Sequence, residues 1–222
     1  MLDNTNIIVI TNTLSNNVIS EKRRNNIIKN FGKYNINILF NHGITRDTND
    51  KSIKHMFYVS LNNLNTIKKL DYDYVLLCDD DFVPIDNFLE ELNKTIEVLP
   101  KDWHILHLCP GFLWGRFYKD KNKIGKLNPE YNIEHFEYDI SKRFFINLSY
   151  DILANINGWL GGPIALVIKK KYINEIILNY SKYENMNYNN DVILTNMYNK
   201  NTFVCANPIL GYENEEGGTT FN

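Results

Sequence analysis

The stretch YDYVLLCDDDFV, residues 72–83, joins an apolar run to three consecutive aspartates. We expect residues 72–78 to form a strand, because a short apolar run is typical of a strand buried on both faces. Such strands occur mostly in α/β proteins, whose helices cover both faces of a parallel sheet. Ligands of these sheets bind beyond the carboxyl ends of the strands, so Asp79, Asp80 and Asp81 stand where a binding site is expected.

The rest of the chain alternates between strand and helix patterns on both sides of this stretch. Strands are predicted at 6–11, 36–40, 72–78, 103–109, 163–168 and 202–206, and helices at 21–31, 51–70, 85–98, 170–183 and 191–198. Residues 110–160 form an insertion over the sheet, with a short antiparallel strand at 144–148. No repeat or linker divides the chain, so residues 1–222 are predicted to form a single α/β domain with a mostly parallel central sheet.

Composition and charge exclude several classes of protein. The 24 Lys and Arg against 26 Asp and Glu leave a net charge of -2, which provides no basic field for a nucleic acid. We expect no membrane span and no signal peptide, because no apolar run approaches the length needed. The three cysteines lack metal or redox spacing, so we expect core packing in a reducing compartment, the cytoplasm. The 35 asparagines indicate codon bias from an AT-rich genome.

The three aspartates repel one another, and no lysine or arginine lies within several residues of them in the sequence. A cation would remove that cost. Asp79 and Asp81 would point the same way if the backbone stays extended, giving two carboxylate ligands for Mg²⁺ or Mn²⁺ that also needs phosphate oxygens. The alternative is that the aspartates cap the helix expected after Pro84.

Residues 72–108, YDYVLLCDDDFVPIDNFLEELNKTIEVLPKDWHILHL, resemble the D-x-D region of GT-A glycosyltransferases, especially family 25, the lipopolysaccharide and collagen sugar transferases. The segments IIVITNTLSNNVISEKRRNNIIKNF, GPIALVIKKKYINEII, NNDVILTNMY and NPILGYENEEGGT are similar to other parts of that family. Glycosyltransferase domains of large DNA viruses also look similar, which would place the protein in the cytoplasm of a host. The chain departs from family 25 around Ser60, where HMFYVSLNN replaces a G-C-x-x-S-H pattern.

The resemblance implies a Rossmann-like GT-A domain that uses Mn²⁺ or Mg²⁺ and a nucleotide sugar. A UDP-sugar is favoured as the donor, and the acceptor would be a hydroxyl of a glycan or protein. Under this interpretation Asp81, with Asp79, holds the metal, which bridges the donor diphosphate as a Lewis acid.

The remaining candidate residues follow from where a donor would lie on such a sheet. We expect the nucleotide across the strand ends, near Thr11, Asn12, Thr13, Arg23, Arg24, Asp79, Asp80, Gly161 and Gly162. For the two arginines, a solvated helix face is the alternative. Trp114 and Trp159 would stack on sugar rings, or lie in plain turns.

Inversion at the sugar carbon needs a base, and Asp191 fits that role. It opens a predicted helix, whose free N–H groups favour its ionised form, although helix capping explains the same placement.

Two further interpretations remain open on the sequence alone. The D-x-D-x-V pattern from Asp79 to Val83 also matches haloacid dehalogenase-like phosphohydrolases, with Asp79 as nucleophile and Asp81 as acid. That family needs a later lysine and a second acidic pair, whereas Asp191 stands alone after Asn190. A nucleotide-sugar binding module without turnover is the other alternative. His104 and His107, on an apolar strand, are expected to be core residues rather than ligands.

Overall fold

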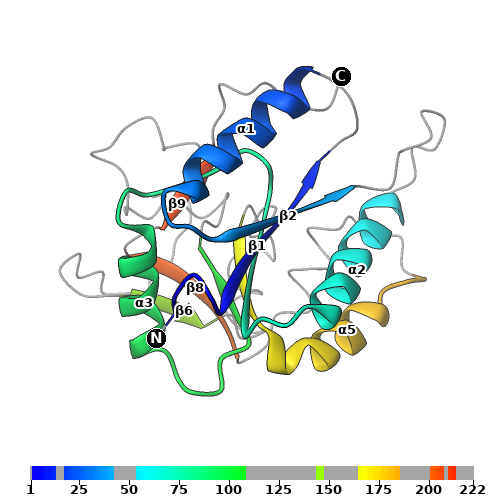
Figure 1. Ribbon diagram of the computed structural model, residues 1–222. Helices are drawn as coiled ribbons and strands as arrows, with labels where there is room; N and C mark the ends of the chain where they lie inside the picture. The colour runs from blue at the N-terminus through cyan, green and yellow to red at the C-terminus, as the bar shows by residue number, and fades with distance from the viewer. Residues whose placement is uncertain are drawn as a thin grey trace, which may run out of the picture.

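The computed structural model describes residues 2–13, 18–42, 54–108, 144–147, 165–185, 201–207 and 210–213. These residues form a seven-stranded sheet and a separate two-stranded ribbon, with helices packed on both faces of the sheet (Figure 1). The α/β class predicted from the alternation of strand and helix patterns is therefore confirmed.

The main sheet has the strand order β2-β1-β3-β7-β5-β8-β6. Its strands are β1 (Ile7–Thr13), β2 (Asn37–His42), β3 (Tyr74–Cys78), β5 (Ile105–His107), β6 (Phe144–Asn147), β7 (Ala165–Lys169) and β8 (Thr202–Asn207). The pairs of β1 with β2, β1 with β3, and β5 with β8 are parallel, whereas β7 is antiparallel to both β3 and β5, and β6 is antiparallel to β8. Five strands thus run one way, and the sheet is mostly parallel, as predicted.

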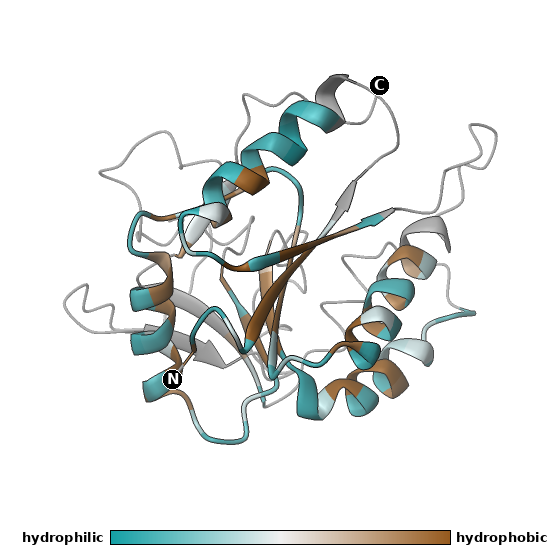
Figure 2. Cartoon of the chain, viewed as in Figure 1, coloured by the Kyte–Doolittle hydropathy of each residue, from teal (hydrophilic) through white to brown (hydrophobic). Residues whose placement is uncertain are grey.

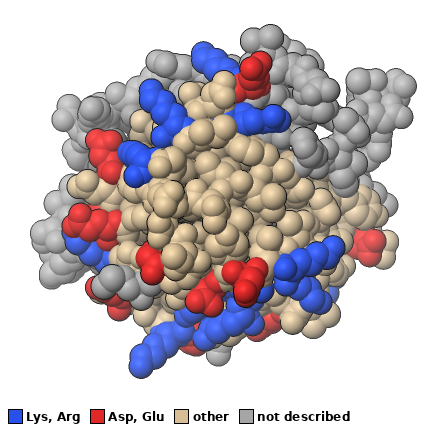
Figure 3. Space-filling view, in the orientation of Figure 1, with Lys and Arg blue, Asp and Glu red and all other residues tan. Residues whose placement is uncertain are grey.

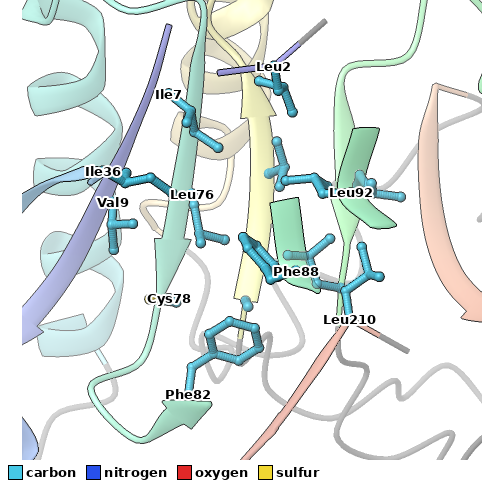
Figure 4. Packing of buried hydrophobic residues seen from close by; sticks show 14 of the residues in the cluster. Leu2, Ile7, Val9, Ile36, Leu76, Cys78, Phe82, Phe88, Leu92 and Leu210 are labelled. Atoms are coloured by element: carbon cyan, nitrogen blue, oxygen red, sulfur yellow. The ribbon is translucent and has the colours of Figure 1, made fainter. Parts of the chain in front are cut away.

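Two apolar clusters cover the two faces of the sheet. The first cluster holds Leu76 of β3 with residues of α1 (Val18–Gly32) and α3 (Phe88–Val98), and Figure 4 shows part of it. The second holds Val75 with residues of α2 (Lys54–Lys69) and α5 (Ile173–Ser181). Neighbouring side chains of β3 point to opposite faces, which explains the apolar run. Figure 2 shows the resulting apolar strands between helices with polar outer faces.

The second sheet is a ribbon that the sequence did not predict. β4 (Phe82–Pro84) pairs antiparallel with β9 (Gly211–Glu213), so the helix expected at 85–98 begins three residues later, at Phe88. Gly211 is required here, because a Cβ atom at this position would lie 2.2 Å from the Phe82 ring. The ribbon therefore places the end of the described chain beside the segment that follows the three aspartates.

Other boundaries differ from the predictions by a few residues. β1 continues through Asn12 and Thr13, which were expected to be a loop, and the helix expected at 170–183 is a 3₁₀ turn, η2 (Lys170–Tyr172), followed by α5. The antiparallel strand expected at 144–148 is confirmed as β6. The helix predicted at 191–198 lies outside the described residues.

The face of the molecule drawn in Figure 3 carries mixed charge. Acidic and basic side chains stand close together on the face drawn in Figure 3, in line with a formal net charge of -2. Among the helices that the structure describes, none has the length and apolarity needed to cross a bilayer.

Candidate functional site

The three aspartates form a tight turn at the carboxyl end of β3. The backbone N–H of Phe82 donates a hydrogen bond to the carbonyl oxygen of Asp79 over 3.2 Å, and the chain then enters β4. The prediction that Asp79 and Asp81 point the same way assumed an extended backbone. The backbone forms a turn here instead. The aspartates do not cap α3 either, because that helix begins at Phe88. We call residues 79–81 the acidic turn.

Arg23 of α1 provides the positive charge that the sequence around the acidic turn lacks. Its Nη1 atom lies 2.6 Å from Oδ1 of Asp80 and 3.1 Å from Oδ2 of Asp81. Arg23 is 6% exposed and Asp80 is 8% exposed, so this is a buried ion pair rather than a solvated helix face. Removing one partner of such a pair typically costs about 3–5 kcal/mol, because the other charge is left buried without compensation.

The helical spacing of α1 explains how Arg23 reaches the acidic turn. Ile27 and Phe31 are fully buried against the sheet, and Arg23 precedes them at the same interval of four residues. The arginine thus belongs to the buried face of α1. A basic residue that continues an apolar stripe at this spacing was the signal in the sequence that Arg23 is buried, although that signal does not name its partner.

The charges of the acidic turn raise the pKa values of two neighbouring groups, Arg23 and Cys78. Burial lowers the pKa of the Arg23 guanidinium, but the hydrogen bond to Asp80 and the charges of Asp80, Asp81 and Asp79 outweigh it, so the net pKa is raised. Burial, followed by the three aspartate charges, raises the pKa of the Cys78 thiol well above its usual value. Cys78 is therefore a buried neutral thiol, and the expectation of core packing is confirmed for this cysteine.

Asp79 is the exposed carboxylate of the acidic turn, and Asp81 is only slightly more exposed than Asp80. The side chain of Asp81 is 14% exposed. Within the described ranges, no group of three His, Cys, Asp or Glu side chains is placed to hold a metal ion. Two carboxylates nevertheless fit Mg²⁺ or Mn²⁺, which is commonly bound by one or two carboxylates together with substrate phosphates and water.

The ends of β1 and β2 lie at the same edge of the sheet as the acidic turn. Thr11 is fully buried and stands opposite Cys78, whereas Asn12 and Thr13 follow it toward the strand end, opposite Asn41 and His42.

Arg24 and Asn41 have partners on neighbouring elements at this edge. The Arg24 guanidinium lies over the Phe40 ring, with Cζ 5.4 Å from the ring centroid. The Asn41 side-chain amide donates a hydrogen bond of 2.6 Å to Oδ1 of Asn63, which is buried on α2.

The structure brings together some of the predicted site residues and does not describe others. Thr11, Asn12, Thr13, Arg23, Arg24 and the acidic turn belong to elements that meet at one edge of the sheet. The remaining candidates lie outside the described residues: Asp191, Gly161, Gly162, Trp114 and Trp159.

The two histidines near β5 are core residues, as expected. His107 is fully buried, and burial lowers its pKa to about 3. His104 is 4% exposed, stacks on Tyr172 with ring centroids 3.7 Å apart, and has Nδ1 3.8 Å from Oε1 of Glu175. Burial lowers the pKa of His104 as well, although the Glu175 charge opposes this shift.

Comparison with known proteins finds likeness in structure but not in sequence. No protein-family model and no curated protein sequence matches the chain. A solved glycosyltransferase involved in glycosylation of the major capsid of PBCV-1 aligns over 89% of this chain and 80% of its own, with a TM-score of 0.49 and 11% identity. A Drosophila β-1,4-galactosyltransferase 7 variant, solved with manganese, UDP-Gal and xylobiose, aligns over 94% of this chain and 72% of its own, with a TM-score of 0.40 and 11% identity.

Proposed function

We propose that this chain is a metal-dependent glycosyltransferase that moves a sugar from a nucleotide-diphosphate donor to a hydroxyl group. The observation that carries the proposal is the acidic turn at the carboxyl end of β3, inside a mostly parallel sheet covered by helices on both faces. This is the edge at which α/β sheets bind their ligands. It carries three carboxylates, and two of them, Asp80 and Asp81, contact the buried Arg23.

In this proposal Asp79 and Asp81 hold Mn²⁺ or Mg²⁺ together with the donor diphosphate. The metal supplies a Lewis acid for the charge that develops on the departing diphosphate. Asp80 is not a metal ligand in this proposal, because it is buried and paired with Arg23. The nucleotide lies across the ends of β1 and β2, where Asn12, Thr13 and Arg24 are the nearest candidates for contact.

The remaining roles rest on the sequence resemblance. Asp191 would be the base that takes the proton of the acceptor hydroxyl, which gives inversion at the sugar carbon. Gly161 and Gly162 would line the donor, and Trp114 and Trp159 would contact sugar rings. We propose a UDP-sugar as donor, a glycan or protein as acceptor, and the cytoplasm as the site of action.

Asp81→Ala tests the proposal, with Asp86→Ala as the matched control. The Asp86 side chain is fully exposed, with only a surface contact of 3.8 Å to Lys33, so its removal should change little. The native protein should gain thermal stability with Mn²⁺ and one of a panel of UDP-, GDP- and CMP-sugars, and should hydrolyse or transfer that sugar. Asp81→Ala should lose about a hundredfold or more in turnover, whereas the control keeps it.

Three results would contradict this function. Full turnover of Asp81→Ala in the presence of a chelator would exclude the metal role of the acidic turn. Release of phosphate from simple phosphoesters, with fluoroberyllate trapped on Asp79, would favour a phosphohydrolase. Nucleotide-sugar binding by calorimetry without product at any metal concentration would favour a binding module.

A further inference from the structure

Gly211 of β9 lies against the residue that directly follows the acidic turn. A Cβ atom at Gly211 would overlap Cε2 and Cζ of the Phe82 ring and would lie 2.8 Å from the carbonyl oxygen of Val83. Non-bonded carbon atoms pack at about 3.5–4.0 Å. The two strands of the ribbon can therefore approach this closely only because position 211 carries no side chain.

The Phe82 ring is enclosed on its other sides and has little room to move away from Gly211. It is 1% exposed, stacks on Phe31 of α1 with centroids 6.3 Å apart, and meets Phe88 of α3 edge-on at 6.4 Å. Figure 4 shows the ring pointing from β4 into the first apolar cluster. Because such cores are close-packed, and because the Val83 oxygen belongs to the backbone, a side chain at position 211 would have to displace β4 itself.

A displacement of β4 would be passed directly to the acidic turn. The backbone N–H of Phe82 donates the 3.2 Å hydrogen bond to Asp79 that closes the turn. The other strand of the ribbon is fixed by the residue before Gly211. The N–H of Leu210 donates to the carbonyl oxygen of Leu108 over 3.4 Å, and its own carbonyl accepts from Ile85 over 3.2 Å. It is therefore β4, rather than β9, that is expected to shift.

We propose that Gly211 is a positioning residue for sugar transfer, which sets the place of the acidic turn at the carboxyl end of β3. This inference rests on the proposed function. Gly211 touches no substrate and acts through Phe82, which joins the turn to the ribbon. A misplacement of about 1 Å in a reacting group can reduce turnover by about a hundredfold. The last strand of the described chain thus belongs to the site, although it lies more than 120 positions after the acidic turn.

Gly211→Ala tests the positioning role in the full chain, with Gly32→Ala as the matched control. Gly32 ends α1, and a Cβ atom there would meet nothing within 4 Å. We expect kcat at saturating donor, well below the melting temperature, to fall at least about tenfold in Gly211→Ala and less than twofold in the control. A glycine that served stability alone would lower the melting temperature and leave the kcat of the folded protein unchanged.

Hydrogen exchange of the Phe82 amide, followed by nuclear magnetic resonance, reports on the turn without relying on activity. This amide should exchange at least about tenfold faster in Gly211→Ala, because displacement of β4 weakens its bond to Asp79. An unchanged exchange rate would show that the turn had not moved and would overturn the proposed route.

The double variant Gly211→Ala with Phe82→Leu tests whether the Phe82 ring carries the effect. Leucine lacks Cε2 and Cζ, the ring atoms that the new Cβ would overlap, but the close approach to the Val83 oxygen remains. The kcat of the double variant should lie at least about threefold above Gly211→Ala and at least about twofold below Phe82→Leu alone. Circular dichroism and the melting temperature establish that each variant is folded. If Gly211→Ala alone does not fold, the comparison of the double variant with Phe82→Leu decides the question.

The outcomes separate this inference from the proposed function. Turnover by the native protein, with Gly211→Ala within twofold of it, would overturn the positioning role and leave the proposed function standing. A loss of kcat that Phe82→Leu does not relieve would also overturn it, because the ring would not be the route. Absence of turnover by the native protein, with Mn²⁺ and each sugar of the donor panel, would overturn both.

Discussion

His107 is a titratable side chain enclosed in the sheet, and its burial makes stability depend on pH. The folded protein keeps the ring neutral down to about pH 3, because burial lowers its pKa to about 3, whereas an unfolded chain takes up a proton near pH 6.5. Between these values the unfolded state binds more protons. The free energy of unfolding should therefore fall as the pH drops below about 6.5, by up to about 1.4 kcal/mol per pH unit from this residue.

Urea unfolding at pH 7, 6, 5 and 4 checks this dependence, with His107→Gln as the reference. Glutamine retains polar atoms but does not titrate. The free energy of unfolding of His107→Gln should therefore fall less steeply as the pH drops, and the difference in slope should correspond to about one proton. Other titrating groups, including His104, are common to both proteins and cancel in the difference. Parallel curves for the two proteins would show that His107 titrates in the folded protein as it does in the unfolded chain.

The acidic turn illustrates what a sequence can predict about a single site. Three carboxylates after an apolar strand were sufficient to locate a candidate site, because strand ends in α/β sheets are where ligands bind. The partner of Asp80 was not predictable in the same way, since Arg23 lies 57 positions earlier and reaches the turn only through the packing of α1. The pairing depends on tertiary geometry, which local pattern does not contain.

At the scale of elements, α3 begins with the help of a residue from the loop after α1. The Tyr34 hydroxyl accepts a hydrogen bond of 3.2 Å from the backbone N–H of Phe88, and its one proton is shared between the carbonyl oxygens of Ile85 (3.0 Å) and Asp86 (2.5 Å). The N-cap residue, Asn87, makes no side-chain capping bond. Tyr34 therefore caps the start of α3, although it lies 54 positions before Phe88 in the sequence.

Tyr34→Phe should lower the free energy of unfolding by about 1–2 kcal/mol, because it removes a hydroxyl that hydrogen-bonds to backbone groups at the start of α3. The ring, whose centroid is 6.0 Å from that of Phe88, is retained, so packing is preserved. Chemical denaturation measures the loss. Tyr58→Phe is the matched control, since that side chain on α2 is 40% exposed and should change stability by less than about 0.5 kcal/mol. Equal effects of the two substitutions would exclude the capping role.

The element that the sequence misplaced is β4. Pro84 is compatible with a helix start, and the apolar spacing from Ile85 onward supported one, so the local pattern favoured a helix from that point. The strand forms because Phe82, Val83 and Pro84 pair with Gly211, Tyr212 and Glu213, more than 120 positions later. A three-residue strand has too little pattern of its own to be recognised without its partner.

At the scale of the whole molecule, the two apolar clusters should unfold as one unit, because β3 and β7 contribute side chains to both. Leu76→Ala in the first cluster and Ile168→Ala in the second should each lower the free energy of unfolding by about 2–5 kcal/mol. Leu178, which is 64% exposed on α5, is the control, and its replacement by alanine should cost less than about 0.5 kcal/mol.

Unfolding followed by fluorescence and by circular dichroism checks whether the clusters are coupled. The two probes should report one coincident transition in the native protein and in both core variants. A first transition in Ile168→Ala that removes only the α2 and α5 side would show instead that the faces unfold separately.

The sheet order could not be derived from the sequence, although the strands themselves mostly could. Apolar runs identify β1, β2, β3, β5, β7 and β8, but a run buried on both faces carries no mark of its neighbours or its direction. The central place of β7, antiparallel between β3 and β5, depends on pairing between strands far apart in the sequence. Only the preference for a mostly parallel sheet followed from the alternation of strands and helices.

The central place of β7 in the sheet also affects how the protein folds during translation. Cys78 is the last residue of β3, and its partner in β7, Ala165, lies 87 positions later in the chain. Translation of these residues takes roughly 4–17 s at about 5–20 residues per second. During that interval β1, β2 and β3 are already synthesised, but the backbone groups of β3 that will face β7 have no strand to pair with. An open edge of this kind invites pairing with another nascent chain. The yield of folded protein in a cell should thus depend on translation speed and on chaperones that shield β3 until the ribosome has passed residue 169.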